Sequence, residues 1–390
     1  MSPAAGHAAD GAGSAADTPG GWLLGVDSGG SGLRVALARQ RTSAGAGTGQ
    51  VAGFTERTGG DRARESVGRG EGPEVVGVLT CPEPVRTSTA GIDAAHMAAQ
   101  LVPAVRSLLA DAGGGTDGRG TARIAAACVG AAGMATLGGQ LRAELPGALA
   151  GAFGVRRLAL AADAVTAYAG ALGERPGAVV AAGTGMIAMG TDLHSWQRAD
   201  GWGHLLGDCG SGAWIGRAGL EAALRAFDGR TGGSAALRAR AEAVFGQPLS
   251  ALPGQLYPRT DRAAVLASFA PEVARCARED PVAARIVREA AREIAASAVA
   301  VCPGGGAGSA SGDGSTGSAE GEVLVGCAGG LFKLGEALLG PLRAELAERL
   351  PAARVVEAPG GPLEGALLIA AQLAGDRLAL PSDPALLSVA

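Results

Sequence analysis

The sequence of 390 residues contains few aromatic side chains, no asparagine and no excess of positive charge. Aromatic residues make up 3% of the chain and hydrophobic residues 47%, so Ala, Val and Leu must fill the core. The formal net charge is −4, which lacks the basic footprint of a nucleic-acid-binding protein. No apolar run reaches the roughly 20 residues that a membrane helix needs. We therefore expect no nucleic-acid partner and no membrane partner.

The six cysteines are scattered and include no Cys-x-x-Cys spacing, which argues against zinc ribbons and disulfide frameworks. Cys128 and Cys327 lie in apolar runs, and we expect both to be buried. Residues 1–20 have neither a basic start nor a continuous apolar core, so we do not expect a signal peptide. These features predict a cytoplasmic protein in a reducing compartment.

Two parts of the chain repeat the order strand, glycine turn, helix, strand, helix. The first copy has apolar runs at 122–133 and 156–163, and the second has them at 322–330 and 353–359. Each copy is preceded by a strand, a Gly-rich turn and a second strand, at 22–38 in the first half and 178–190 in the second. A duplication of this kind implies two similar α/β lobes that face each other across a cleft. Chance similarity among Ala- and Leu-rich helices is the alternative.

The remaining segments define the expected domain organisation. Residues 1–20, 41–72 and 303–321 are rich in Gly, Ser or Ala and are expected to be disordered, the last as a surface insertion. Helical periodicity at 213–227, 234–245, 261–278 and 281–301 predicts additional helices on the second lobe. We expect a tail at 1–20, a first lobe at 21–165, a second lobe at 166–362, and a C-terminal helix and tail at 363–390 that can return to the first lobe.

Two glycine turns between apolar runs are suited to phosphate. Their backbone N–H groups can approach a ligand closely, and an acidic residue at the first strand end suits a hydrated magnesium ion. A tight hairpin with an exposed aspartate is the alternative for the first turn. The predicted phosphate and metal residues are Asp27, Gly29, Gly30, Ser31, Gly183, Thr184 and Gly185.

Asp163 follows a buried strand at the point where a helix starts. A carboxylate there can cap the helix, or it can accept the proton of a hydroxyl group that attacks a phosphoryl group. The two roles are compatible.

The order "DSGGSGLR … AADAVTAYAG … AAGTGM … GWGHLLGDCGSGAWIG … CAGGLFKLGEAL" resembles the N-acetylglucosamine kinase branch of the sugar-kinase/Hsp70/actin superfamily, also described as BadF/BadG/BcrA/BcrD-type ATPases. The resemblance covers about residues 22–375. It implies an α/β fold of two RNase H-like, actin-like ATPase lobes with a cleft between them. It also implies ATP and Mg²⁺ as cofactors, an amino sugar as the substrate, and a homodimer as one form that relatives adopt.

The resemblance also implies roles for particular residues. Asp163 is the expected catalytic base and a substrate contact, and Asp27 is the expected metal-binding residue. The adenosine contacts are expected at Gly329, Gly330 and Ala267. The sugar contacts are expected at Gly201, Trp202, Gly203, Asp208, Met186 and Ile187.

Trp202 can offer a flat apolar surface to a sugar ring, and Asp208 can accept hydrogen bonds from hydroxyl groups. We expect Trp214 to pack in the core and His204 to be structural. The chain departs from the family at three places: it has no asparagine in the first lobe, Cys209 stands where glutamate is usual, and Met186–Ile187 replaces Ser-Asn. N-acetylglucosamine, glucosamine, N-acetylmuramic acid and another hexose therefore stay open as substrates.

The expected function is ATP-dependent phosphorylation of an amino sugar, with the 6-hydroxyl of N-acetylglucosamine as the first choice. One alternative is an ATPase that activates a radical dehydratase through a bridging iron–sulfur cluster. A second alternative is a non-catalytic sugar sensor. Cys128 and Cys327 in strand-like runs disfavour the first alternative, and the presence of both Asp27 and Asp163 disfavours the second.

Overall fold

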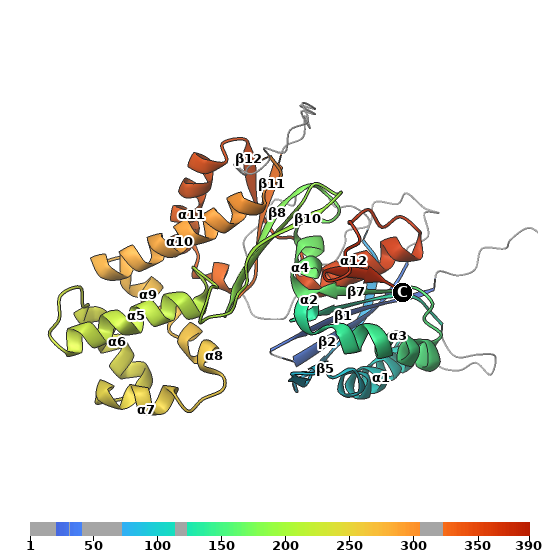
Figure 1. Ribbon diagram of the computed structural model, residues 1–390, viewed down its shortest axis with the longest axis horizontal. Helices are drawn as coiled ribbons and strands as arrows, with labels where there is room; N and C mark the ends of the chain where they lie inside the picture. The colour runs from blue at the N-terminus through green and yellow to red at the C-terminus, as the bar shows by residue number, and fades with distance from the viewer. Residues whose placement is uncertain (1–20, 31, 41–71, 114–122, 305–322) are drawn as a thin grey trace, which may run out of the picture.

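The computed structural model of this protein describes residues 21–30, 32–40, 72–113, 123–304 and 323–390. In Figure 1 these residues form two β-sheets with helices around them, and one group of helices extends to the left of the second sheet. The segments expected to be disordered lie outside the described residues, except at their ends.

The first sheet has six strands in the order β13-β7-β6-β1-β2-β3. β1 pairs with β2 and β2 with β3 in antiparallel fashion, whereas β6 and β7 continue the sheet parallel to β1. Leu, Val and Ala fill these strands; β6 and β7 are almost wholly buried, and β1 is buried over most of its length. The strands are β1 Trp22–Gly29, β2 Gly32–Arg39, β3 Glu74–Cys81, β6 Ile124–Ala131, β7 Leu158–Ala162 and β13 Leu387–Val389.

The second sheet has five strands in the order β10-β9-β8-β11-β12. Its pairing repeats that of the first sheet: three antiparallel strands are followed by two strands parallel to the central one. The strands are β8 Gly177–Ala182, β9 Met186–Thr191, β10 Trp196–Asp200, β11 Val323–Ala328 and β12 Ala353–Glu357. The repeated strand order confirms the predicted fold of two RNase H-like lobes, because unrelated helical similarity would not reproduce sheet topology.

The helices follow the strands in the same order in each half. The first half contains α1 Ala94–Asp111, α2 Met134–Leu137, α3 Gly139–Phe153 and α4 Asp163–Leu172, with a small hairpin of β4 Thr87–Ser88 and β5 Gly91–Ile92. The second half contains α5 Gly212–Phe227, α6 Ala235–Phe245, η1 Leu249–Ala251, α7 Leu252–Leu256, α8 Arg262–Ala267, α9 Ala270–Cys276, α10 Pro281–Val301, η2 Gly330–Leu334, α11 Glu336–Arg349 and α12 Pro362–Ala374.

The helix expected over 261–278 is in fact two helices, α8 and α9. They are separated at Ser268 and Phe269. Pro271 lies in the first turn of α9, where its missing N–H costs nothing, but the same ring would clash with the preceding turn of a continuous helix.

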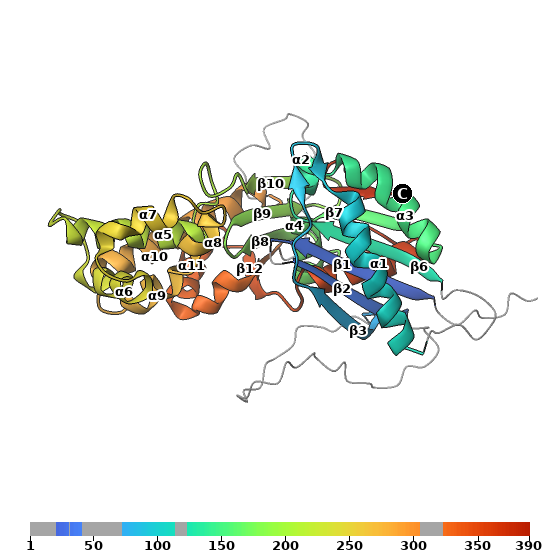
Figure 2. The same cartoon turned by 90° about the horizontal axis from the view of Figure 1, so that it is seen from below.

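Two helices connect the sheets in a crossed arrangement. α12 follows the last strand of the second sheet but packs against β1 and β6 of the first, whereas α4 packs against β8 and β11 of the second sheet. Figures 1 and 2 both place α4 between the two sheets. Glycine permits the close contact of the two helices, because a Cβ on Gly365 would lie 1.8 Å from the carbonyl oxygen of Thr166. Any movement of one sheet against the other must therefore involve this helix pair.

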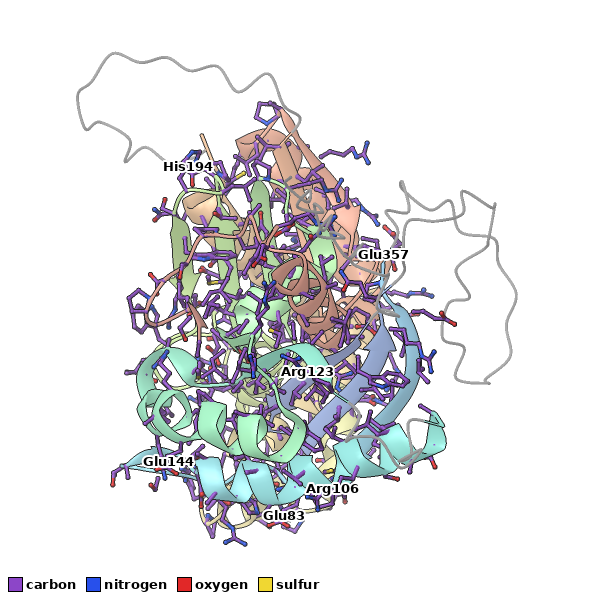
Figure 3. The ribbon with its side chains drawn as sticks, turned by 90° about the vertical axis from the view of Figure 1, so that its right-hand side faces the viewer. Glu83, Arg106, Arg123, Glu144, His194 and Glu357 are labelled. Atoms are coloured by element: carbon purple, nitrogen blue, oxygen red, sulfur yellow. The ribbon has the colours of Figure 1, made fainter. Side chains whose placement is uncertain are left out.

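The C-terminal segment adds a second connection. β13 extends the first sheet by pairing with β7, and the indole N–H of Trp196 on β10 donates to the carbonyl of Pro381 at 2.7 Å. Figure 3 shows Arg106 on α1 and Glu144 on α3 at one end of the molecule, with His194 at the opposite end. Within the described ranges, no helix combines the length and apolarity needed to cross a lipid bilayer.

Candidate active site

The carboxyl ends of the parallel strands bring two aspartates to one edge of the first sheet. Asp27 near the end of β1 pairs with Gly130 of β6, and Ala131 of β6 pairs with Ala162, the residue before Asp163. The two carboxylates are close enough for the charge of Asp27 to act on Asp163. The sequence predicts both aspartates at the ends of strands, and the parallel pairing of β1, β6 and β7 brings them to the same edge of the sheet.

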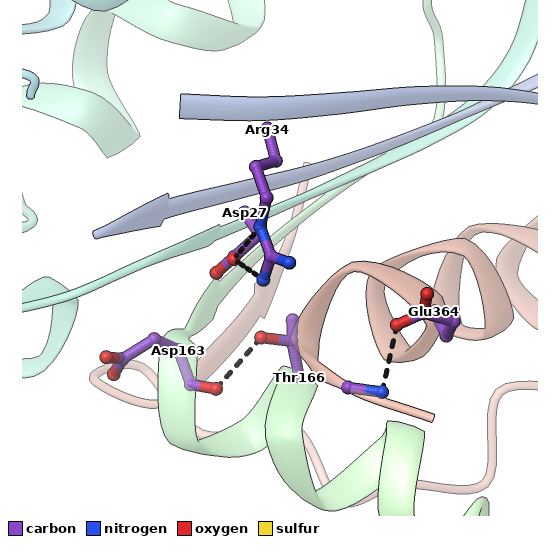
Figure 4. A network of polar contacts seen from close by, with 6 residues as sticks. Asp27, Arg34, Asp163, Thr166 and Glu364 are labelled. Atoms are coloured by element: carbon purple, nitrogen blue, oxygen red, sulfur yellow. Dashed lines mark hydrogen bonds and ion pairs between the residues drawn. The ribbon is translucent and has the colours of Figure 1, made fainter. Parts of the chain in front are cut away.

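Asp163 is the first residue of α4. Its Oδ1 accepts the N–H of Ala164 at 2.9 Å, and its carbonyl accepts the Thr166 hydroxyl at 2.9 Å, as Figure 4 shows for the latter bond. Ala162 occupies the N-cap position of α4, so Asp163, which the sequence offers as a cap, lies one residue further into the helix. Burial, and then the nearby charge of Asp27, raise the pKa of Asp163 above its ordinary value. A buried carboxylate with a raised pKa is a stronger base than a free one, and such groups are characteristic of catalytic sites.

Asp27 forms an ion pair with Arg34, its direct partner across the β1–β2 register (Figure 4). The Nε and Nη2 atoms of Arg34 donate to the same oxygen, Oδ2, at 3.0 and 2.5 Å. Among the described residues, Oδ1 of Asp27 has no hydrogen-bond partner. Our sequence interpretation assigned no role to Arg34, although the alternation of side chains along two paired strands could have placed it beside Asp27.

The first glycine turn faces open space. A Cβ on Gly29 or Gly30 would meet no atom within 4 Å, so a ligand can approach the backbone there. Gly32 has a φ of +121°, and a Cβ on it would lie 2.3 Å from the carbonyl oxygen of Cys81. Ser31 lies outside the described residues.

The second glycine turn lies at the amino end of α5. The carbonyls of Gly183 and Thr184 accept the N–H groups of Gly212 and Ala213 at 2.9 and 3.0 Å. Thr184 is exposed, and a Cβ on Gly183 would meet nothing within 4 Å. A turn held at a helix amino end is favourable for an anion, since the helix dipole presents its positive end there.

Residues 200–211 form a loop that two carboxylates hold in place. Asp200 accepts the N–H groups of Asp208 and Cys209 at 2.7 and 2.8 Å. Asp208 in turn accepts the N–H of Gly203 at 3.0 Å and that of Met186, which ties the loop to the second glycine turn. Burial, and then the charge of Asp200, raise the pKa of Asp208. Asp200 was not among the predicted site residues, and its place beside the Gly201–Gly203 turn was the signal for it.

Two of the four non-glycine residues with positive φ among the described residues lie in this loop. Asp200 and Asp208 have φ values of +59° and +53°, in the left-handed region of backbone conformation that residues other than glycine adopt uncommonly. Strain of this kind persists when surrounding contacts over-determine the conformation, and it is typical of ligand-binding segments.

Trp202 projects from this loop into solvent. Its side chain is 66% exposed, and the guanidinium of Arg198 lies 4.5 Å from the ring centroid. Leu205 and Leu206 on the same loop are also exposed. The indole is therefore available for stacking, whereas Trp214 packs against the second core and His204 is half-buried.

The other predicted contacts are placed as follows. The Met186 side chain is buried in the second core, while Ile187 is partly buried and lies against Gly201. Ala267 contacts Gly212, whose N–H bonds to the second glycine turn.

Gly329 has a φ of +106°, and a Cβ there would lie 2.3 Å from the carbonyl oxygen of Ala182. The predicted adenosine residue Gly329 is thus beside the end of β8, and Gly330 next to it is exposed and faces open space.

A pocket of about 740 Å³ lies between α9, α10 and the start of α11. Lys333 and Leu334, at the end of the η2 helix that begins at Gly330, line one side, and α9, which follows Ala267 in the chain, lines another. The lining combines small apolar residues with cations. It consists of Pro271, Ala274, Arg275, Ala277, Arg278, Ala284, Val287, Arg288, Lys333, Leu334, Glu336, Ala337 and Pro341.

The two cysteines of the strand-like runs, Cys128 and Cys327, lie within strands of the two sheets. Cys128 is fully buried in β6, and Cys327 is partly buried in β11, where burial raises the pKa of its thiol to about 12. All six cysteines are free thiols. Within the described ranges, no group of three or more His, Cys, Asp or Glu residues has the arrangement of a metal centre.

The structure thus brings the predicted residues into two groups. The first contains Asp27, Asp163 and the first glycine turn, on the first sheet. The second contains the Gly183–Gly185 turn, the 200–211 loop and Ala267, on the second sheet. Gly329 lies beside the second group, and Met186 contributes to it through its backbone.

Comparison with known proteins gives a consistent result. Residues 24–370 match the BadF/BadG/BcrA/BcrD ATPase family. A segment of 69 residues is 45% identical to the N-acetylmuramic acid/N-acetylglucosamine kinase of Clostridium acetobutylicum. That alignment spans 17% of this chain and 22% of the kinase.

Two solved structures share the fold over nearly the whole chain. A candidate N-acetylglucosamine kinase from Chromobacterium violaceum is 26% identical with a TM-score of 0.57, covering 90% of this chain and 99% of its own. A second candidate N-acetylglucosamine kinase, from Porphyromonas gingivalis, is 16% identical with a TM-score of 0.55, covering 89% of this chain and 97% of its own. At that lower identity, the second structure supports the fold alone.

Proposed function

This chain belongs to the BadF/BadG/BcrA/BcrD ATPase family, and from that premise we propose that it is an ATP-dependent amino-sugar kinase. The proposed acceptor is the 6-hydroxyl of N-acetylglucosamine. The observation that carries the proposal is the pair of carboxylates at one sheet edge, Asp27 and Asp163, beside an open glycine turn. The names of two similar proteins, the N-acetylmuramic acid/N-acetylglucosamine kinase of Clostridium acetobutylicum and the candidate N-acetylglucosamine kinase of Chromobacterium violaceum, support the choice of sugar.

Asp163 is the proposed general base. The hydroxyl oxygen of the sugar forms a bond to the γ-phosphorus of ATP, and the bond from that phosphorus to the β,γ-bridging oxygen breaks. ADP leaves with the electron pair, and the hydroxyl proton passes to the Asp163 carboxylate. The raised pKa of Asp163 brings the base closer to the operating pH, which favours proton transfer.

The residues at Asp27 fit a magnesium ion. Both Arg34 donors go to Oδ2, so that Oδ1 remains open among the described residues, and one carboxylate oxygen is what Mg²⁺ takes when phosphates and water complete its shell. Bound there, the ion would neutralise phosphate charge. Asp27 would hold it, and Gly29 and Gly30 would give the phosphates access to the backbone N–H groups.

The 200–211 loop is the proposed sugar-binding element. Trp202 offers its exposed indole to the apolar face of the ring, with Arg198 supporting it. Asp208 uses part of its acceptor capacity to fix Gly203, and we assign the remainder to a sugar hydroxyl. Asp200 acts as a positioning residue, because its two backbone hydrogen bonds hold Asp208 in a strained conformation.

The second glycine turn and the neighbouring pocket are the proposed ATP site. Gly183–Gly185 would receive the phosphates at the amino end of α5, and the nucleoside would extend past Gly329 and Gly330 toward the pocket between α9 and η2. Ala274 and Val287, two buried apolar residues of the lining, suit a base ring.

A coupled ADP-release assay with Mg·ATP tests the proposal. The panel contains N-acetylglucosamine, glucosamine, N-acetylmuramic acid, N-acetylmannosamine, glucose and no sugar. ADP release that depends on one amino sugar supports the kinase and identifies its substrate. ADP release without any sugar indicates an ATPase, and sugar binding without ADP release indicates a sensor; either result refutes the proposed reaction.

A further inference from the structure

The pocket between α9, α10 and the start of α11 carries positive charge that ATP would leave unused. In the proposed placement the phosphates of ATP lie at the Gly183–Gly185 turn, and the nucleoside that extends toward the pocket is neutral. The lining nevertheless includes four cations and one acidic side chain, Glu336. Because the whole chain has a formal net charge of −4, this positive surface is opposite in sign to the protein as a whole.

Ion pairs within the protein balance part of this charge. Arg275 shares the Glu272 carboxylate with Arg240, and Glu336 accepts a hydrogen bond from Nη1 of Arg343 at 2.8 Å. The other three cations of the lining have no hydrogen-bond acceptor and no ion-pair partner among the described residues. These three unpaired cations are Arg278, Arg288 and Lys333.

The three unpaired cations come from different elements that meet at the pocket. Lys333 lies on η2, a 3-10 helix with three residues per turn, so it shares a face of that helix with Gly330, which we place beside the nucleoside. On α10, the exposed Arg288 directly follows the buried Val287. An apolar surface for the base ring and exposed cations therefore lie side by side in the lining.

Grouped cations of this kind suit a phosphate group. A phosphorylated hydroxyl carries a charge of about −1.5 to −2 at neutral pH and three acceptor oxygens, which guanidinium and ammonium donors match. In a nucleotide, a phosphate outside the 5′ position is carried by the 2′ or 3′ hydroxyl of the ribose. The ribose is also the part that would connect phosphates at the glycine turn to a base in the pocket.

We propose that this pocket binds a nucleotide that carries a phosphate group on its ribose in addition to its 5′-diphosphate. The three unpaired cations bind the ribose phosphate, and the base packs on Ala274 and Val287. Such a ligand fills the ATP site but has no γ-phosphoryl group to transfer, so it inhibits the kinase in competition with ATP. No covalent bond forms or breaks in this role. The inference rests on the proposed ATP site, and the competing interpretation is that the three cations are solvated surface charges.

Calorimetry with Mg²⁺ present compares ADP, ADP with a 2′-phosphate and ADP with a 3′-phosphate. One of the two isomers should bind about 5- to 100-fold more tightly than ADP, because three exposed charge contacts add together. This gain should shrink as the salt concentration is raised, since exposed charges are screened. Lys333→Gln and Arg288→Gln should each reduce the gain about 2- to 5-fold, with ADP affinity unchanged within about twofold.

Arg285→Gln is the matched control. Arg285 lies on the same helix as Arg288, but it is not part of the lining and its Nη1 pairs with Oε1 of Glu289 at 3.5 Å. Its loss removes the same charge from the same element. The affinities for ADP and for the ribose-phosphorylated isomer should both stay unchanged.

The sequence offers a direct probe of the site, because Lys333 is the single lysine among the 390 residues. Reductive methylation with ¹³C-formaldehyde keeps the charge and labels one side chain and the α-amino group. The methyl signal of Lys333 should shift on addition of the ribose-phosphorylated ADP, and the shift should exceed the one that ADP causes. Inorganic phosphate at the same concentration should leave the signal in place.

Equal affinity for ADP and for both ribose-phosphorylated isomers would overturn the proposal, and so would a gain that Lys333→Gln and Arg285→Gln reduce equally. A matching shift of the Lys333 signal with inorganic phosphate would overturn it too, because the ligand would then be a free anion. The kinase proposal fails separately, if the wild-type protein binds ADP but phosphorylates no sugar. The calorimetric comparison would still decide whether the pocket binds a ribose phosphate.

Discussion

Replacing Asp163 with Asn should lower kcat without lowering the stability of the fold. Burial raises the pKa of this carboxyl group, which makes it a better base but also makes its ionised form unfavourable in the folded protein. Asn keeps the shape and can still accept the Ala164 N–H that Asp163 now accepts at 2.9 Å. It cannot accept a proton from the sugar. Loss of a general base predicts a kcat about 100- to 10,000-fold lower, with ATP and sugar affinities retained.

The effect on stability has a definite sign. The unfolded carboxyl group loses its proton near its ordinary pKa, whereas the folded group, with its raised pKa, keeps the proton to higher pH. Between those two pKa values the folded state binds more protons, so wild-type stability falls as pH rises through this window. Asp163→Asn removes that loss, and the variant should be at least as stable as the wild type at neutral pH, with the advantage vanishing below the window.

Two measurements check this prediction. Steady-state ADP release gives kcat across pH, where the wild type should lose activity as acid protonates Asp163, and urea unfolding across the same range gives stability. Asp192→Asn is the control: although partial burial acts to raise it, hydrogen bonds from Ser195 and His194 lower the pKa of Asp192 overall. The Asp192→Asn variant should keep full activity. It should be less stable than the wild type at pH values above the ordinary pKa of aspartate, where the lowered pKa of Asp192 stabilises the wild-type fold. A variant of Asp163 that is inactive and markedly less stable would refute the reasoning, since Asp163 would then be a structural cap.

Three further predictions concern the loop and the helix crossing. Trp202→Ala should raise the sugar KM about 10- to 100-fold with little change in the ATP KM, and an equal effect on both would make Trp202 structural. Asp200→Ala should raise the sugar KM and increase protease cleavage within the 200–211 loop; unchanged cleavage would show that its two backbone hydrogen bonds do not hold the loop. Gly365→Ala should destabilise the protein by about 1–3 kcal/mol, because the new Cβ would meet the Thr166 carbonyl oxygen at 1.8 Å. Gly147→Ala, in α3 with nothing near its Cβ, should instead be neutral or stabilise by up to about 1 kcal/mol, and similar values for both would contradict the packing argument.

The central strands could be predicted because their sequences are apolar runs bounded by glycine turns. Apolar runs with glycine turns gave β1 and β2 in one half and β8 and β9 in the other, and their recurrence gave two similar lobes. The edge strand β10 was missed because its sequence, WQRAD, is polar and short, and it pairs on one side alone. Propensity carries little information at such a strand, whose identity depends on its neighbour.

The candidate site could be predicted where its reactive side chains lie at the ends of strands. Asp27 and Asp163 both follow buried runs, and the parallel pairing of β1, β6 and β7 brings them together. The sequence carried a signal for Arg34 in the alternation of side chains across the hairpin, and one for Asp200 in its place beside the Gly201–Gly203 turn. Their actual contacts, across the β1–β2 register and to the backbone of the 200–211 loop, needed the structure.

The crossed packing of α4 and α12 was likewise out of reach. α12 follows the second sheet in the sequence but packs on the first, and α4 follows the first sheet but also packs on the second. An amphipathic pattern does not say which apolar surface a helix will cover.

The measurement that tests the account most directly is phosphorus NMR of the complete reaction. The protein is incubated with Mg·ATP and N-acetylglucosamine, and the products are identified and counted. The account predicts one new phosphomonoester, coupled to the protons on carbon 6 of the sugar and equimolar with ADP. ADP accompanied by inorganic phosphate, with no sugar phosphate, would contradict the kinase.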